Sequence, residues 1–502
     1  MTKVLAEATT VQLAPEVGGF AVAPTVDWVQ FQANPGGIRN WQNSYQVTER
    51  DPLSKYATME AGEPVGFDAT PELEHDLTKD LLDVIASPTF RSIAKHSGNT
   101  GESLFRPTAV TATGYTVPTL GALTQGLLIK AQGFATAANN GVKLVGAGSI
   151  ATEIKTLGLV AEVVDPQAGA TVEVCGVQGA LGDIQIDIDG NLISTVLDLT
   201  TLGLYAGQWL AIGGATTATR FATADYNGTA KIVSTTTTKI TLARRSWTVG
   251  AADAGAGKTI ELRFSRWYRN VSIDHADYRE PTLHGELEEL GPGPGGVATY
   301  VYGRGMGLKT HVINAPLESK IVSTLTFVAK DMADPVLVAD RVAGATTSRR
   351  PMAAALWHTS CPQMQRVRIT RIADNFPLAV EVNSWQFTME HNVKPREIQG
   401  ECGAVDLIYG KVQPSVTMEI YYTTSEVVKA MRDNPEVAWD AQIRNHQAGW
   451  ILDMPYVRIR NGQRTFAANE AVMASLEVPG FREPSSNIVA SLSVFADWPE
   501  TP

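Results

Sequence analysis

The chain has 502 residues, a formal net charge of −11 and a pI near 5.3. This length is too great for one compact core and predicts two to four domains. A hydrophobic content of 44% and a charged content of 19% are typical of globular proteins rather than disordered ones. The acidic balance argues against a protein that reads nucleic-acid sequence, because such proteins carry a basic face.

Residues 1–24 are rich in Ala, Val, Gly and Pro without a clear period, and they predict a terminal arm. They lack the apolar core of a signal peptide, and the sequence contains no apolar run of transmembrane length. The three cysteines (Cys175, Cys361 and Cys402) are odd in number and widely spaced, which fits a reducing compartment. We therefore expect a soluble protein that is made in the cytoplasm.

Four segments recur in the same order and indicate an internal duplication. Alternating apolar residues, such as Leu73 and Val416, predict strands with one side facing a core. Any single match is explained as well by coincidence between amphipathic strands, but the ordered series favours duplication. The matched segments are 29–31 with 367–369, 43–48 with 383–388, 71–77 with 414–420, and 321–329 with 488–496.

A short helix follows the third segment in each copy. In the first copy, apolar residues recur every four positions and form one stripe. Each helix is expected to stop at a proline, Pro88 in the first copy and Pro435 in the second. The predicted core residues of the two helices are Leu77, Leu81, Ile85, Val427, Val428 and Met431.

Between residues 106 and 262 the sequence becomes rich in Thr, Ala and Gly with short β-rich runs, which predicts an inserted all-β domain. This region repeats Phe-Ala-Thr-Ala and then Asn-Gly at 134–141 and 221–228, and each Asn-Gly pair predicts a type I′ hairpin. The first module is thus split into 25–105 and 263–333. A linker at 334–358 and a second module at 359–502 complete the expected organisation.

Motifs for enzyme chemistry are incomplete. Gly255–Thr259 resembles the end of a phosphate-binding loop, but Ala252 occupies the position of the first glycine and a predicted strand follows. Asp187–Gly190 lacks the carboxylates of a calcium loop at the first and twelfth positions. The histidines have no metal-ligand spacing, and the sequence has no Gly-x-Ser-x-Gly elbow. We expect no enzymatic activity, cofactor or metal.

The segment Asn314–Asp331 resembles the final strand of the major tail tube proteins of long, non-contractile-tailed bacteriophages, the siphoviruses. In that family an apolar-polar strand follows an Asn-containing turn and ends near Gly/Ala-Lys-Asp. Pro71–Phe90, a strand followed by a Leu-Leu helix and an aromatic residue, is similar to the family's middle segment. The resemblance covers about 25–95 and 265–332, and more faintly 363–497. The second copy departs at its end, with Asp497-Trp-Pro where the first has Lys330-Asp-Met.

The resemblance implies a mainly β fold of two tandem β-sandwich modules, each with a short flanking helix, plus the inserted domain. The family stacks six-module rings around a DNA channel, so two modules in one chain imply a homotrimeric, pseudo-hexameric ring. The inserted domain would decorate the outside and be dispensable. The implied partners are further copies of the chain, a tape measure protein, and tail terminator and distal tail proteins. DNA would be passing cargo only, no membrane would be involved, and the protein would lie in the virion tail after assembly in the host bacterial cytoplasm.

Acids of the first module are candidates for the channel lining. DNA must pass without sticking, and carboxylates on alternate strand positions repel phosphate over a Debye length of about 8–10 Å. Ordinary solvated acids on an outer face are an equal alternative. Two other function classes stay open: another virion structural protein, such as a capsid decoration or baseplate component, and a glycan-binding β protein. The candidate acids are Glu60, Glu63, Asp68, Glu72, Glu74 and Asp76.

Overall fold

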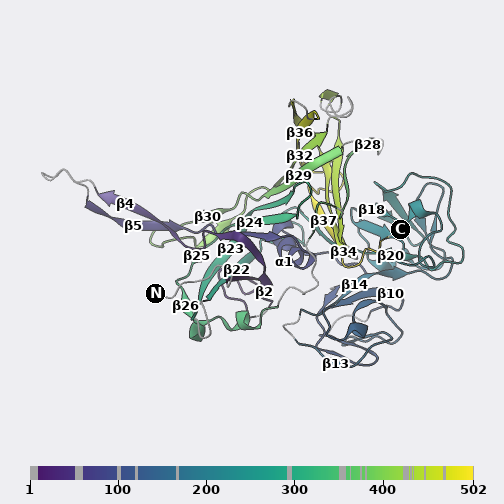
Figure 1. Ribbon diagram of the computed structural model, residues 1–502, viewed down its shortest axis with the longest axis horizontal. Helices are drawn as coiled ribbons and strands as arrows, with labels where there is room; N and C mark the ends of the chain where they lie inside the picture. Colours follow the sequence, from purple (N-terminus) through teal and green to yellow (C-terminus); the bar gives the residue numbers. More distant parts are fainter. Residues whose placement is uncertain are drawn as a thin grey trace.

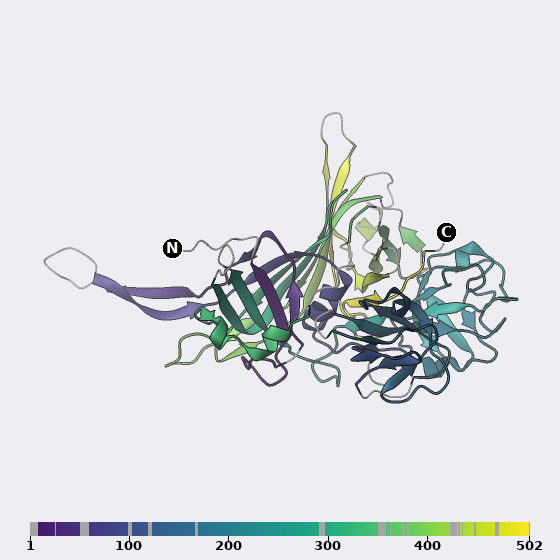
Figure 2. The same ribbon diagram turned by 60° about the horizontal axis from the view of Figure 1, so that its bottom comes forward.

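The computed structural model describes residues 9–25, 27–50, 60–98, 103–118, 123–165, 169–290, 297–349, 358–361, 363–373, 376–378, 381–421, 429, 432–433, 435–445, 448–466 and 471–500. Within these residues the fold is mainly β, as predicted, with antiparallel sheets and the helix α1 (Lys79–Phe90). Figures 1 and 2 show two central sheets, a long hairpin projecting on one side, and a separate β-rich domain on the other.

A long antiparallel sheet forms one side of the central body, and its first four strands have the same order as its last four. In each half, the strand that comes third in space comes last in the chain. Because the number of strands is even and every pairing is antiparallel, the two edge strands run in opposite directions. The order is β3 (Ala33–Arg39), β6 (Glu72–Asp76), β24 (Val322–Val328), β23 (Ala298–Ala315), β29 (Glu381–Glu390), β32 (Gln413–Tyr421), β36 (Met473–Pro479) and β35 (Arg460–Thr465).

Each half carries a hairpin between its first and second strands. In the first half, β4 (Ser44–Arg50) and β5 (Glu60–Asp68) pair with each other and with no other described strand, and they project from the body in Figure 1. In the second half, β30 (Lys394–Arg396) and β31 (Asp406–Ile408) form a shorter pair. β3 and β29 are the first strands of the two halves and run in the same direction. The hairpin that follows each of them therefore projects from the same end of the long sheet.

The matched sequence segments differ in where they lie. Segments 71–77 and 414–420 include β6 and β32, which hold equivalent places in the two halves. Segment 43–48 lies in the projecting hairpin, whereas 383–388 lies within β29. The other two pairs are also divided between different sheets. A period of two identifies a strand with one buried side but not the sheet that it joins, so the duplication stays a prediction.

A second sheet covers the buried side of the long sheet, with α1 between them. Both sheets contribute to one core cluster that includes Leu73, Phe327, Phe387, Trp439 and Trp450. The two halves of the chain therefore share their core. The strand order of the second sheet is β21 (Arg266–Arg269), β37 (Ser491–Phe495), β34 (Ala448–Val457), β33 (Val437–Asn445), β27 (Met364–Arg371) and β28 (Phe376–Leu378).

The segment predicted to be a terminal arm contains a buried strand. Val11 and Leu13 alternate with polar residues and are fully buried in β1 (Thr10–Pro15). β1 pairs with β2 (Val29–Phe31) and with β22 (Thr282–Leu290), which itself pairs with the first half of β23. The short strands β25 (Asp331–Met332) and β26 (Val336–Leu337) also pair with β23.

Helix α1 runs through Pro88 to Phe90, so the predicted stop at the proline is wrong. Pro88 has no N–H to donate to the carbonyl of Val84, but it sits in the last turn, where Thr89 Oγ1 donates to the Ile85 carbonyl at 2.7 Å. Of the predicted helix core residues, Leu77 and Ile85 are buried, whereas the side chain of Leu81 and the residues Val427, Val428 and Met431 lie outside the described part of the chain.

The inserted domain leaves and re-enters the body at one place, because Lys95 and Trp267 form an antiparallel bridge. Its main sheet has two similar lobes, with β14 and β20 meeting at the centre. The order is β11 (Gly141–Leu144), β10 (Leu127–Gln132), β14 (Thr171–Gln178), β20 (Glu261–Arg263), β17 (Trp209–Ile212), β18 (Thr229–Thr235), β19 (Lys239–Ala243), β16 (Leu192–Ile193) and β15 (Gln185–Ile186), with β7 (Leu104–Phe105) beside β14. A smaller sheet contains β12 (Glu153–Lys155), β9 (Gly114–Thr116), β8 (Ala109–Val110) and β13 (Glu162–Val163).

The two repeated segments, 134–141 and 221–228, form the same structure, but it is not the predicted type I′ turn. The amide of Asn140 bridges the backbone of Phe134 with bonds of 3.0 and 2.8 Å, and Asn227 does the same at Phe221 with 2.8 and 3.0 Å. Both asparagines end a 3₁₀ turn with negative φ, whereas a type I′ turn needs positive φ at both central residues. The side-chain clamp closes each loop instead.

Candidate functional site: the polar face of the long sheet

One side of the long sheet packs on the core, and the other carries exposed and half-buried side chains across β6, β24, β23, β29, β32 and β36. Cross-strand registers place Glu74, Thr324, Val312 and Thr388 in one row on this side. We call this surface the polar face. It comprises Glu72, Glu74, Asp76, Val322, Thr324, Thr326, Thr310, Val312, Asn314, Gln386, Thr388, Glu390, Gln413, Ser415, Thr417, Glu419, Ser475 and Glu477.

The polar face follows from strand alternation. In β6 the burial alternates from Glu72 to Asp76, with Leu73 and His75 fully buried. The same alternation runs through β24, β29, β32 and β36. Hydroxyl and amide side chains make up most of the exposed positions, so the sheet presents many weak hydrogen-bonding groups and few apolar ones.

The candidate acids do not all lie together. Glu72, Glu74 and Asp76 share the polar face, whereas Asp68 lies at the end of the β4–β5 hairpin, where Gln46 donates to it at 2.9 Å. The backbone of β5 contains Glu60 and Glu63, and their side chains lie outside the described part of the chain. The structure therefore brings three of the six candidates onto one surface.

Basic side chains accompany the acids of the first half. Arg39 Nη1 lies 2.7 Å from Glu72, and Arg39 Nη2 lies 3.6 Å from Glu74. Lys320 Nζ lies 2.7 Å from Asp76. All of these groups are part-exposed, so the pairs add little stability. Their main consequence is local neutralisation, which reduces the repulsion that these acids exert on a passing anion.

The second half supplies three acids that sequence reasoning missed: Glu390, Glu419 and Glu477. Glu419 accepts a hydrogen bond from Ser384 at 3.3 Å. A usable signal was present, because Gln386, Thr388 and Glu390 alternate with buried Trp385, Phe387 and Met389. An acidic surplus does not reveal this pattern, because hydroxyl and amide residues dominate it.

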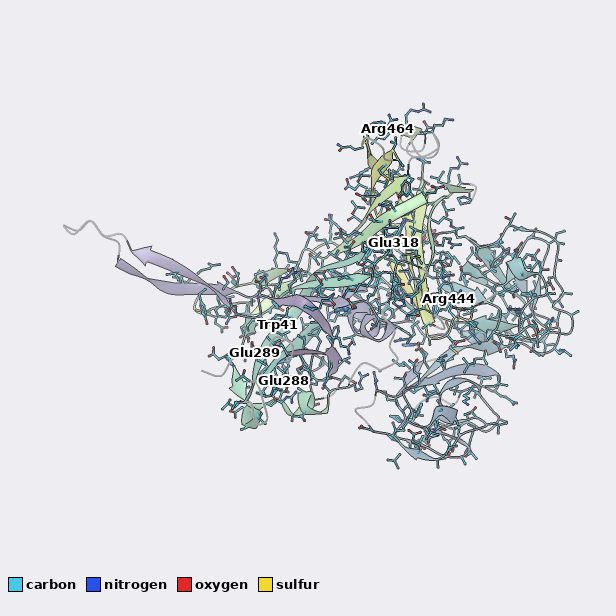
Figure 3. The ribbon with its side chains drawn as sticks, viewed as in Figure 1. Trp41, Glu288, Glu289, Glu318, Arg444 and Arg464 are labelled. Atoms are coloured by element: carbon cyan, nitrogen blue, oxygen red, sulfur yellow. The ribbon has the colours of Figure 1, made fainter. Side chains whose placement is uncertain are left out.

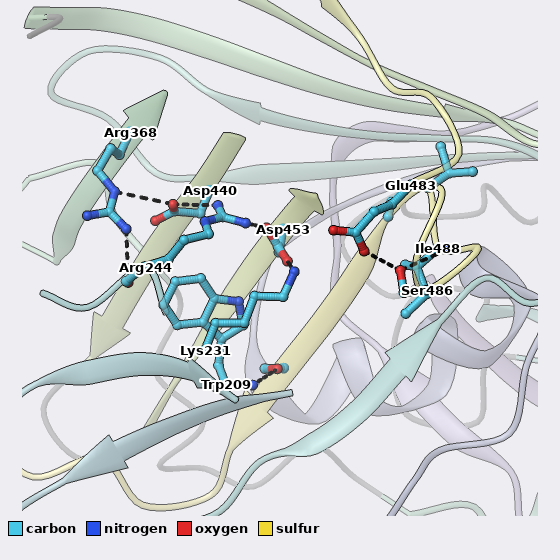
Figure 4. Close-up of polar contacts among 12 residues, drawn as sticks. Trp209, Lys231, Arg244, Arg368, Asp440, Asp453, Glu483, Ser486 and Ile488 are labelled. Carbon is cyan, nitrogen blue, oxygen red and sulfur yellow. Dashed lines mark hydrogen bonds and ion pairs between the residues drawn. The ribbon is translucent and has the colours of Figure 1, made fainter. Parts of the chain in front are cut away.

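A buried ionic joint attaches the inserted domain to the second sheet. Arg244 of the inserted domain contacts Asp453 and places Nη2 2.6 Å from Asp440, and both carboxylates are fully buried. Lys231 adds a 2.7 Å contact to Asp453, and Arg366 of β27 lies 2.9 Å from Asp440. Figure 4 shows Lys231, Arg244, Asp440 and Asp453 meeting between the two parts of the chain.

The pKa shifts at this joint follow from burial and charge. Burial alone raises the pKa of Asp440, but Arg366, Arg244 and Arg368 outweigh it and hold the pKa below the ordinary range. For Arg368, burial is the largest effect and lowers the pKa to about 10, with Arg366 and Arg244 adding to the decrease. The joint is therefore ionised at neutral pH and rich in positive charge.

Two further carboxylates anchor the inserted domain. Glu173 of β14 lies 3.0 Å from Lys79 Nζ of α1 and 2.6 Å from Arg266 Nε of β21. Asp497, after β37, lies 3.2 Å from Lys130 in one lobe and 2.8 Å from Arg263 beside the other. The departure noted at the end of the second copy thus has a structural role, because Asp497 holds both lobes against the body.

Within the described ranges, no His, Cys, Asp or Glu side chains gather in a group that could hold a metal ion. A search of the same residues finds no helix with the length and apolar character needed to cross a membrane.

Comparison with known proteins identifies the family. The family model for the phage tail tube protein matches residues 176–480, which is more than half of the chain. A search of curated proteins finds no match. The matched range includes the second lobe of the inserted domain, β21 to β24 and all four strands of the second half of the long sheet. The chain belongs to the phage tail tube protein family and is a structural component of the virion tail.

Proposed function

We propose that this protein builds the tail tube of a long, non-contractile-tailed phage from rings of three chains, with the polar face lining the bore. The observation that carries the proposal is the long sheet itself, whose two four-stranded halves form one surface, with edge strands that have no second neighbour among the described strands. Because β3 and β35 run in opposite directions, β35 of one chain can pair with β3 of a second in the same antiparallel pattern. Closing the sheet in this way removes both edges.

The ring size is supported by barrel geometry. At a strand spacing of about 4.8 Å and a tilt of about 40°, three chains with eight strands each give a backbone diameter of about 48 Å, whereas two chains give about 32 Å. After a layer of side chains of about 5 Å on each wall, two chains leave a bore about as wide as a DNA duplex. Three chains leave room for hydration.

The chemistry of the polar face supports a conduit. Hydroxyl and amide groups bind phosphate weakly, and the acids Glu390 and Glu419 disfavour it. The arginine and lysine in the first half, Arg39 and Lys320, already contact carboxylates. DNA would pass as cargo during ejection. Before that, a tape measure protein would occupy the bore, and tail terminator and distal tail proteins would close its ends.

The projecting hairpin supports contact between stacked rings. Tyr45, Val47 and Val65 in β4 and β5 are 55–60% exposed, and a two-stranded hairpin alone is marginally stable in water. Both hairpins leave the long sheet at one end, so a second ring placed there would cover them. Their unequal lengths would give the contact threefold rather than sixfold symmetry.

The test is electron microscopy of the purified protein at high concentration. We expect hollow tubes or rings with three protruding domains, and scattering mass in solution that corresponds to multiples of three chains. Dispersed monomers at every salt concentration, or rings with another subunit number, would contradict the proposal. A deletion of residues 46–66, which removes most of β4 and β5, is the informative variant because it should leave single rings intact and prevent their stacking.

A further inference from the structure

A cavity of about 250 Å³ lies on the second lobe of the inserted domain. Figure 3 shows this domain, with its side chains, on the side of the body opposite the projecting hairpin. Among the described residues the lining contains two bases and no acid, and none of it belongs to the buried ionic joint. Because the volume is below the range of pockets for drug-sized ligands, the cavity suits a small molecule. The lining residues include Thr217, Arg220, Phe221, Ala222, Ala224 and Lys258.

The two bases, Arg220 and Lys258, form no ion pair with a described residue. Lys258 Nζ donates to the carbonyl of Thr217 at 2.7 Å, and Thr217 also lines the cavity, so the ammonium is held at its wall. An ammonium has three donors and a guanidinium five, so both bases keep donors for an anion. At the buried ionic joint, by contrast, each base contacts a carboxylate.

One wall of the cavity is a loop that the first lobe also contains. The side-chain amides of Asn140 and Asn227 close the two loops alike, and each amide also donates to the carbonyl of the equivalent threonine, Thr136 or Thr223, at 3.3 Å. The backbone angles of the two threonines agree, with φ −81° and ψ 117° in the first lobe and φ −75° and ψ 107° in the second. The N–H groups at the start of the two loops are therefore arranged in the same way.

In the first lobe this loop binds a carboxylate of the chain itself. Glu162 accepts hydrogen bonds from the N–H groups of Ala135 at 2.8 Å and Thr136 at 3.1 Å, and from Asn139 Nδ2 at 2.7 Å. Burial raises the pKa of Glu162, but the hydrogen bonds from Asn139, Thr136 and Ala135 outweigh it and hold the pKa below its ordinary range. The loop therefore stabilises an ionised carboxylate.

In the second lobe the same place is only partly filled. Asp253 accepts from the N–H of Thr223 at 3.3 Å, a longer bond than either backbone bond to Glu162. The N–H of Ala222, the counterpart of Ala135, has no hydrogen-bond partner among the described residues, and Ala222 lines the cavity together with the two bases. One backbone donor and two cations thus surround a space that a carboxylate occupies in the first lobe.

We propose that the cavity binds a small monocarboxylate. Its oxygens pair with the two bases and with the N–H of Ala222, and its alkyl part lies on Phe221. A phosphate dianion fits less well, because Asp253 lies at the adjacent N–H and repels the second negative charge. Strand β20 rather than a helix follows the segment 255–259, so this segment lacks the helix dipole of a phosphate-binding loop.

Ligand-observed NMR titration of the full chain tests this inference. The probes are butyrate and inorganic phosphate, and the reference is butyramide, which has the shape of butyrate without its charge. We expect butyrate to bind at least about tenfold more tightly than butyramide, since a charge-assisted hydrogen bond contributes that much, and more tightly than phosphate. Absence of butyrate binding, equal binding of butyramide, or tighter binding of phosphate would overturn the proposal.

Two variants and one matched control locate the site. Lys258→Met and Arg220→Met remove the charges, and each should weaken butyrate binding by about tenfold. The control is Lys143→Met, because Lys143 Nζ also donates to a backbone carbonyl, that of Ala138 at 2.8 Å, but does not line this cavity. All three side chains are partly exposed, so thermal unfolding should stay unchanged. Equal butyrate affinity in wild type and both cavity variants would refute the assignment.

Amide NMR of protein labelled with ¹⁵N-alanine tests the backbone donor directly. Butyrate should shift the amide resonance of Ala222, which is identified by its loss in Ala222→Gly. The resonance of Ala135, identified in the same way, should stay unchanged because Glu162 already accepts from that N–H. An unshifted Ala222 resonance, or an equal shift at Ala135, would contradict binding at this loop.

Discussion

Acidification from about pH 7 to pH 5 should destabilise the folded chain through its buried histidines. Burial lowers the pKa of His75 and His358 to about 4 and that of His311 to about 3. Burial, and then the positive charge of Arg91, puts the pKa of His391 well below its ordinary value. Arg91 Nε donates to Nδ1 of His391 at 3.0 Å, which holds that ring neutral.

The sign follows from proton binding. An unfolded histidine has a pKa near 6.5, so the unfolded chain binds more protons than the folded chain once the pH falls below that value. The stability is therefore fully present above about pH 6.5 and is lost as the pH falls toward the folded values near 4. At pH 5 each of the four buried histidines costs about 2 kcal/mol, or about 8 kcal/mol together. This loss is comparable with the whole stability of a typical domain, about 5–15 kcal/mol.

Urea unfolding of the unassembled chain at a series of pH values measures this loss. The variant His358→Phe is the sharpest test, because both ring nitrogens of His358 lack a hydrogen-bond partner among the described residues and the ring packs edge-on against Trp450. We expect wild-type stability at pH 7 and a gain of about 2 kcal/mol over wild type at pH 5. The control Trp450→Phe should change the free energy of unfolding by the same amount at every pH. If the difference between His358→Phe and wild type were also the same at every pH, the reasoning would be refuted.

Three further predictions concern the joint and the polar face. Asp440→Asn removes the carboxylate shared by three arginines, so it should lower the free energy of unfolding by about 3–5 kcal/mol; an unchanged urea midpoint would contradict this. The double change Glu72→Lys and Glu74→Lys leaves Arg39 without its partners and adds positive charge to the proposed bore. It should therefore slow DNA ejection in a real-time release assay. Unchanged kinetics would show that these acids do not line the bore. Replacing residues 97–265 by a short linker exposes Trp498 and the buried carboxylates, so we expect aggregation rather than bare tubes, as measured by light scattering.

Much of the fold could be predicted from local pattern. The alternation in Glu72–Asp76 predicts a strand with one acidic and one buried side, as β6 has, and the short β-rich runs between residues 106 and 262 predict the strands that form there. The neighbours of each strand could not be predicted, because alternation along one strand does not say which other strand pairs with it. Lys320 reaches Asp76 only because β24 lies beside β6, although 244 residues separate them in the chain. The hairpin at 44–68 also looked like any other amphipathic segment, since exposed Tyr45 and Val47 imitate a core-facing alternation.

The buried ionic joint and the polar face both carry carboxylates and bases, but these charges lie in different environments. At the joint, Asp440 and Asp453 are removed from water and contacted by arginine and lysine, an arrangement that adds little net stability although the loss of one partner is costly. The inserted domain is thereby fixed to the sheet that carries β37. On the polar face the carboxylates remain hydrated, and their basic partners are exposed and replaceable. In the tube that we propose, the first arrangement would lie outside and the second would line the bore. Arg244 lies on the inserted domain and contacts Asp440 and Asp453 of the second sheet, so we expect the fold of the body to depend on that domain.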